Sequence, residues 1–126
     1  MGRASTDTLT NKTLTKPTIN GSINAITSDV DGATITFDMS ASNIHQVTLG
    51  GNRTLAVSNV SVGQTFTIIL AQDGTGSRTI SGWFSGISWA GGSVPTLTTT
   101  ASKKDMFTFL CTSAGVYIGT VSGQNI

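Results

Sequence analysis

Residues 8–22 repeat a five-residue unit, and this spacing is the feature that most constrains what the chain can fold into. Each unit carries one aliphatic residue, at Leu9, Leu14 and Ile19. On an α-helix, residues five apart point about 140° away from each other. On a flat strand they face opposite sides, because the side-chain period is two. The repeat therefore cannot bury its aliphatic residues against one face of a regular element.

Folding this segment on its own would be unfavourable. Ordering about twenty residues costs on the order of 20–40 kcal/mol, whereas burying three aliphatic side chains returns only about 1.5–3 kcal/mol each. We therefore expect residues 1–27 to form an extended attachment arm that becomes ordered when another chain supplies backbone partners and apolar surface. Lys12 and Lys16 lie in this arm and either meet an acidic docking surface or remain solvated. Such an arm indicates assembly rather than catalysis.

The composition favours β-structure in the rest of the chain. Charged residues make up 10% of the 126 residues, against about 25% in an average domain. Glutamate, a common helix former, is absent, and Thr, Ser, Gly, Val and Ile dominate. A chain of this length is one domain's worth, so residues 28–126 are expected to form one knob. The net charge of +1 gives no electrostatic footprint for nucleic acid or a membrane surface.

Alternating hydrophobicity and turn residues predict the fold class of the knob. About eight short strands, roughly ten residues apart, argue for an all-β, jelly-roll-like β-sandwich with an extended N-terminal arm. Glycine-containing turns at 50–52, 73–76 and 113–115 are expected to close hairpins. Uncharged strand edges with few gatekeepers are an association liability unless an oligomer covers them. The expected strands are 33–39, 44–49, 53–60, 64–72, 77–81, 96–100, 104–112 and 116–122.

Few residues offer catalytic or metal-binding chemistry. His45 is the only histidine, and without a Gly-x-Ser-x-Gly elbow we interpret it as an ordinary strand histidine. Cys111 is the only cysteine; it excludes an intramolecular disulfide and is expected to be a buried small hydrophobe. Asp29 and Asp31 faintly resemble a calcium loop, but no glutamate is present to close it. We therefore expect neither an enzyme nor a metal or other cofactor.

Aromatic residues gather in a glycine-punctuated stretch. Trp83, Phe84 and Trp89 lie between Gly82 and Gly91. Aromatic side chains of this kind stack on sugar rings, pack into a partner, or belong to a core or subunit interface, and the sequence leaves these alternatives open. Because no stretch approaches about 18 apolar residues and the N-terminus lacks an apolar signal core, the protein is expected to be made and used without secretion.

Two parts of the chain resemble accessory structural proteins of tailed-bacteriophage virions. The segment Ser5–Ile19 resembles a phrase that recurs in tail fibres, head fibres and decoration proteins, usually just before a C-terminal β-rich module. Ile87–Leu97, followed by Asp105–Phe109 and Tyr117–Gly119, looks like the closing domain of such proteins. The resemblance implies a homotrimer with knobs side by side and arms attached to the particle.

The resemblance leaves two functions. The first expectation is a capsid decoration, or cement, protein made in the host cytoplasm, whose arm binds the major capsid protein through Leu9, Leu14 and Ile19 and stabilises the shell. It is favoured because the chain is short, with no long shaft and no recognisable baseplate-binding domain before the repeats. The alternative is a tail or head fibre tip that contacts a host-surface glycan through Trp83, Trp89 or Tyr117.

Overall fold

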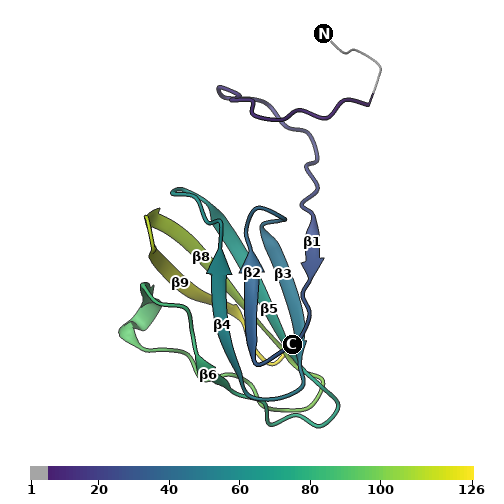
Figure 1. Cartoon of the computed structure of the whole chain (residues 1–126), viewed down its shortest axis with the longest axis vertical. Coiled ribbons are helices and arrows are strands. Elements are labelled where there is room, and N and C mark those ends of the chain that lie inside the picture. Colours follow the sequence, from purple (N-terminus) through teal and green to yellow (C-terminus); the bar gives the residue numbers. More distant parts are fainter. Residues whose placement is uncertain (1–5) are drawn as a thin grey trace.

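A computed structural model of the chain describes residues 6–126, so residues 1–5 of the predicted arm lie outside the described residues. The described part is nearly all β, as predicted. Nine strands form a six-stranded sheet, in the order β1-β3-β5-β8-β9-β7, and a three-stranded sheet, in the order β2-β4-β6 (Figure 1). The strands are β1 (Ile26–Ser28), β2 (Thr34–Asp38), β3 (Ile44–Leu49), β4 (Arg53–Ser58), β5 (Thr65–Gln72), β6 (Ile80–Gly82), β7 (Ile87–Trp89), β8 (Lys104–Ser113) and β9 (Val116–Gly123), with a single 3₁₀ turn at Ala90–Gly92.

The first six strands alternate between the two sheets. β1, β3 and β5 lie side by side in the larger sheet, and β2, β4 and β6 make up the smaller one. Each strand therefore pairs with the next but one along the chain, and all four of these pairings are parallel. Parallel neighbours require a long crossover connection, and here the strand of the opposite sheet provides it. Residues 26–82 consequently wind as a flattened coil between two sheets.

The C-terminal strands complete the larger sheet in a different way. β8 is antiparallel to β5 and to β9, and β9 pairs in parallel with the short edge strand β7. The predicted hairpin at 113–115 is confirmed, and Gly115 adopts the positive φ of 70° that such a tight turn favours. Five of the seven strand pairings in residues 6–126 are parallel. These pairings do not give the antiparallel Greek keys of a jelly roll.

Two of the predicted hairpins are wrong. The connections at 50–52 and 73–76 carry the chain from the larger sheet to the smaller one instead of back along the same sheet. A type I′ hairpin turn needs positive φ at both central residues, and neither Gly50 nor Gly51 has it. At the second connection, the Asp73 carboxylate accepts hydrogen bonds from the backbone N–H groups of Thr75 and Gly76, which turns the chain out of the sheet.

The threonine strand predicted at 96–100 is also wrong, because this segment forms no strand. It is a loop held by side chains of neighbouring strands: the Thr98 N–H donates to Asp105 at 2.7 Å, and its carbonyl accepts from Gln72 at 2.7 Å. The first strand begins at Ile26, inside the segment assigned to the arm. We call residues 26–126 the body. Within residues 6–126, no helix is long and apolar enough to cross a membrane.

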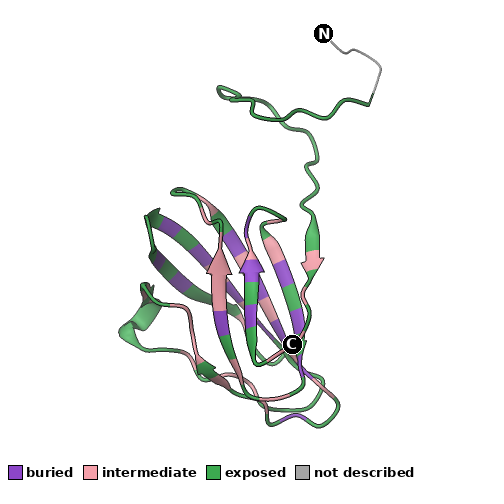
Figure 2. Cartoon of the chain, in the orientation of Figure 1, coloured by how far each residue is buried: buried purple, intermediate pink, exposed green. Residues whose placement is uncertain are grey.

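One apolar core lies between the two sheets. The strands show alternating burial along their length (Figure 2), as expected for sheets that each turn one face inward. Cys111 belongs to this core, as predicted, and its thiol donates to the carbonyl of Ser113. The buried apolar side chains are Ile35, Phe37, Met39 and Leu55 on or beside the smaller sheet and Val47, Leu49, Phe66, Ile68, Leu70, Phe107, Phe109, Cys111 and Tyr117 in the larger sheet.

Candidate attachment site

The described part of the arm, residues 6–25, forms no strand or helix and is exposed throughout. It leads away from the body (Figure 1), and its described residues are coloured as exposed along their whole length (Figure 2). The three aliphatic side chains of the repeat are similarly exposed: Leu9 at 66%, Leu14 at 60% and Ile19 at 64%. Three apolar side chains are thus displayed to solvent on a segment that has no apolar surface of its own to cover them.

The five-residue sequence repeat has a counterpart in the backbone. Asn11, Lys16 and Gly21 have positive φ angles of 53°, 47° and 73°. Each of them follows an aliphatic residue of the repeat by two positions, so every unit bends at the same point. Positive φ is uncommon for residues other than glycine and asparagine, and it interrupts an extended strand. The arm therefore presents its aliphatic side chains in three equivalent steps rather than along one continuous strand.

Residues 8–25 of the arm make no polar contact with the body. Among the hydrogen bonds and ion pairs of the described chain, none involves residues 8–25, and Lys12 and Lys16 form no ion pair with any described residue. The backbone N–H and C=O groups of the repeat consequently remain open to water or to a partner. Such groups are nearly always paired once they are buried, so a protein that covers the arm must supply their partners.

The root of the arm, in contrast, is firmly bound. β1 pairs with the first half of β3, from Ile26 opposite Ile44 to Ser28 opposite Gln46. The Thr27 hydroxyl donates to the Ser42 hydroxyl at 2.7 Å, since Ser42 gives its own proton to a backbone carbonyl. These contacts fix the position and direction in which the arm leaves the body.

A contact between His45 and Asp29 reinforces this root. The His45 side chain on β3 is fully buried, and its Nδ1 lies 2.8 Å from Oδ2 of Asp29, the residue directly after β1. Its Nε2 lies 3.1 Å from the carbonyl oxygen of Ser42. Each ring nitrogen therefore has an oxygen atom within hydrogen-bond distance. His45 is therefore a structural residue that holds the strand from which the arm emerges.

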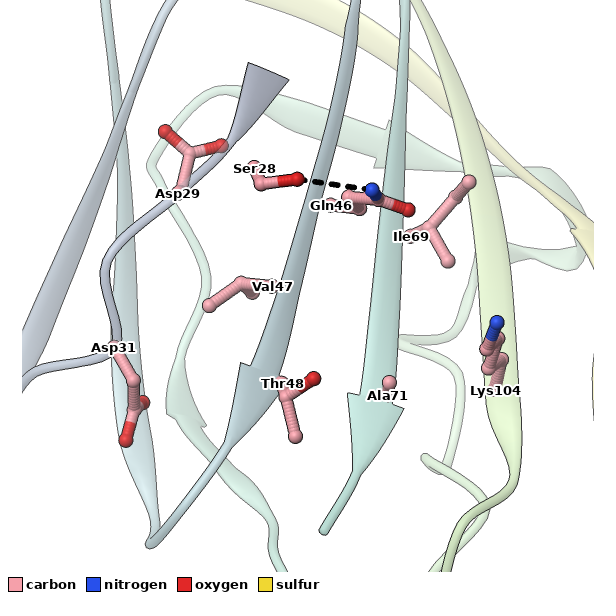
Figure 3. A pocket seen from close by; sticks show the side chains of 9 residues that line it. All are labelled: Ser28, Asp29, Asp31, Gln46, Val47, Thr48, Ile69, Ala71 and Lys104. Atoms are coloured by element: carbon pink, nitrogen blue, oxygen red, sulfur yellow. Dashed lines mark hydrogen bonds between the residues drawn. The ribbon is translucent and has the colours of Figure 1, made fainter. Parts of the chain in front are cut away.

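A hollow lies beside this root, and the two carboxylates that line it already take part in hydrogen bonds within the protein. It measures about 380 Å³ and lies where β1 ends, next to the second half of β3 (Figure 3). Asp29 binds His45, and Asp31 accepts two hydrogen bonds from Arg53, at 2.8 and 2.7 Å. The Arg53 guanidinium holds the pKa of the Asp31 carboxyl below its usual value. The segment that faintly resembled a calcium loop thus uses its carboxylates to fasten the chain.

The predicted aromatic residues come together on the inner face of the larger sheet, near the edge that β9 and β7 form. The Trp83 ring packs edge-on against Trp89 and Phe107, with ring centroids 4.9 Å apart in both cases. Phe84 packs edge-on against Tyr117 at 5.2 Å. Trp83, Phe84 and Trp89 are half-buried, whereas Tyr117 is only 7% exposed, and burial raises the pKa of its hydroxyl. Most of these ring faces and edges are therefore occupied by other rings.

A shallow hollow of about 380 Å³ remains beside the aromatic cluster. Trp83, Phe84 and Trp89 line it together with Val94, Ile80 and neighbouring residues. It is the part of the cluster that a ligand could reach, and Tyr117 does not line it. Trp83 and Trp89 thus pack against the core, and a ligand could still contact them in the shallow hollow.

Sequence reasoning missed two features of the attachment site. The sequence could have indicated the positive φ of Asn11 and Gly21, because these residue types adopt that conformation most readily, but it gave no such indication for Lys16. It also indicated that His45 has a hydrogen-bond partner, without saying which residue. A histidine that alternates with outward Ile44 and Gln46 must face the core, and buried polar groups are hydrogen-bonded. Comparisons with protein-family models, with curated proteins and with solved structures gave no match.

Proposed function

We propose that this chain is an accessory structural protein of a tailed-phage particle: a homotrimeric capsid decoration protein that is made in the host cytoplasm and binds the shell through its arm. The observation that supports this best is the arm itself. Three exposed aliphatic side chains recur at one spacing on a segment without internal support, and a firmly bound root joins that segment to a folded body.

The arm binds by placing Leu9, Leu14 and Ile19 in successive apolar recesses of the major capsid protein. Because a residue of positive φ interrupts each unit, this groove-filling mode suits the arm better than addition of one long strand to a capsid sheet. Full burial of an aliphatic side chain is worth about 1.5–3 kcal/mol, so one arm binds modestly. Three arms on one trimer raise the overall affinity, because each bound arm increases the local concentration of the others.

The proposed protein is not an enzyme. The single histidine that an acid–base mechanism would use is fully buried, and both of its ring nitrogens are engaged in hydrogen bonds. A general base must reach the proton that it abstracts, and His45 has no such access. The role of the body in the proposal is mechanical: it clamps neighbouring capsid subunits while the arms hold it on the shell.

Removal of residues 1–20 is expected to abolish binding to capsids and to leave the body folded, because no hydrogen bond joins residues 8–20 to the body. Co-sedimentation with capsids that lack this protein measures binding, and circular dichroism with thermal unfolding measures folding. In the full-length chain, Leu14→Asp is expected to weaken binding strongly, whereas Thr13→Asp, its neighbour with the same added charge, is expected to weaken it less. Normal capsid binding by the truncated chain would contradict the proposal.

The aromatic hollow supports a second candidate function, a fibre tip that binds a host-surface glycan. Aromatic rings beside a shallow surface hollow suit stacking against a sugar. This function predicts that the isolated protein binds host cells and that Trp89→Ala removes binding at temperatures where circular dichroism shows the variant to be folded. Phe109→Leu serves as the control for general loosening of the cluster, because Phe109 packs against Trp89 but does not line the hollow. Absence of cell binding by the wild-type protein would rule the candidate out.

A further inference from the structure

The outward side of the larger sheet is a wide face that carries almost no charge. We call the outward-pointing residues of β5, β8 and β9 the uncharged face. Cross-strand neighbours on this face form two apolar pairs and two threonine pairs. These pairs are Ile69 with Met106, Leu110 with Ile118, Thr67 with Thr108, and Thr108 with Thr120.

Charged residues are nearly absent from the outward side of the larger sheet. Over all six strands of the larger sheet, Lys104 is the only charged residue that points outward, and it stands at the first position of β8. The other charged residue of β8, Asp105, is buried on the inner side. The Asp31–Arg53 ion pair joins a connection to the first residue of β4, and the Asp73–Arg78 pair lies in the connection between β5 and β6. The solvated side of an antiparallel sheet is normally polar, yet here Leu110 and Ile118 are 39% and 47% exposed.

We propose that copies of this chain associate through the uncharged face, an inference that rests on the homotrimer of the proposed function and assigns the surface that builds it. A copy of the same face brings a single charge, Lys104 at the first position of β8, so little hydration of charged groups is lost on contact. Burying an unpaired charge is costly, so a partner with an ordinary charged surface would bind this face poorly. Threonine hydroxyls both donate and accept, so the threonines of one copy are suited to hydrogen-bond those of the next.

This arrangement also orients the arms. Rotation about a common axis relates the copies of a cyclic oligomer, so every arm leaves the assembly at the same end. In each copy, β1 lies in the sheet that carries the uncharged face, at the opposite edge from β7. The face therefore joins the copies while the roots of the arms, with their Asp29–His45 pairs, remain at the far edge of each sheet.

Light scattering coupled to size-exclusion chromatography tests the assignment on the full-length chain. Leu110→Lys and Thr120→Lys each place a charge in the uncharged face, and Thr36→Lys places the same charge on an exposed position of the smaller sheet. Wild type and Thr36→Lys are expected to show the mass of the oligomer. Both face variants are expected to fall to the mass of one chain, 13.0 kDa, with an unchanged circular dichroism spectrum. Thr120→Lys decides the matter if Leu110→Lys fails to fold.

Each contrary outcome overturns a different statement. Retention of the full oligomer mass by Thr120→Lys would show that the copies meet elsewhere, although the homotrimer would stand. A monomeric wild type would remove both the homotrimer and this interface, while capsid binding through the arm would still be measured independently by the truncated chain. A monomeric wild type whose face variants lose capsid binding would show that the capsid, not a second copy, covers the uncharged face.

Discussion

Replacing Phe109 by alanine is expected to lower the free energy of unfolding by about 3–5 kcal/mol. Phe109 is 1% exposed and stands at the centre of the aromatic cluster. Its ring lies 5.2 Å from that of Phe66, 5.1 Å from Phe84 and 5.5 Å from Trp89. Rings from three separate strands and loops meet there, so the cavity left by the substitution cannot close by moving one side chain.

Urea unfolding followed by tryptophan fluorescence measures this loss, since Trp83 and Trp89 lie in the same cluster. Val62→Ala is the control, because Val62 is an apolar residue in the connection between β4 and β5, 63% exposed and outside the uncharged face. Truncation of an exposed side chain is expected to cost less than about 1 kcal/mol. Equal losses for the two variants would show that the cluster is not part of the core.

Replacing Asp29 by alanine is expected to be the most damaging single change near the arm. It removes the carboxylate that lies 2.8 Å from Nδ1 of the fully buried His45, and leaving a buried polar group without its hydrogen-bond partner costs about 1–3 kcal/mol. The loss should concentrate at β1, because Asp29 follows this strand directly and β1 is paired with β3 over only three residues. Hydrogen exchange at Ile26–Ser28, together with urea unfolding, measures both effects.

Asp31→Ala is the matched control for this variant, two residues further along the same connection. Asp31 also binds a basic side chain, but its pair with Arg53 is partly exposed on both sides. An exposed ion pair contributes about 0–1 kcal/mol, so the control is expected to lose little. If both variants lost equally little, the Asp29–His45 pair would not hold the root of the arm.

The sequence predicted most strands of this protein but not how they pair. A period of two marks a strand and its buried face, which is why β3, β5, β8 and β9 lie close to their predicted ranges. It does not say whether the next strand returns within the same sheet or crosses to another. At 50–52 that choice depends on the φ angles of Gly50 and Gly51, and glycine permits both signs. The sequence therefore did not predict that residues 26–82 wind between two sheets as parallel strands.

The sequence likewise predicted only part of the candidate site. Leu9, Leu14 and Ile19 could be singled out because five-residue spacing fits no regular element, and in the structure all three are exposed. The pairing of Asp29 with His45 could not be predicted, because it depends on β1 lying beside β3, a contact between segments with no local signal. Turn chemistry was informative at Gly115, where glycine permits the positive φ that the tight turn between β8 and β9 adopts.

The arm and the body have separate tasks in this account. The body is stabilised by one core between two sheets and by side chains that fasten its connections, whereas residues 8–25 of the arm make no hydrogen bond or ion pair. A segment that gains its order only on binding can be lost without unfolding the body. Attachment and stability should accordingly respond to different substitutions, with Leu14→Asp changing the first and Phe109→Ala changing the second.

Gold-labelled antibody against this protein, applied to intact phage particles and viewed by electron microscopy, tests the central claim most directly. Our account predicts label spread over the whole head, because a decoration protein occupies repeated sites on the shell. Particles stripped of the protein and restored with the chain lacking residues 1–20 should stay unlabelled. Label confined to the tail or to one vertex, or label restored by the truncated chain, would contradict attachment to the capsid through the arm.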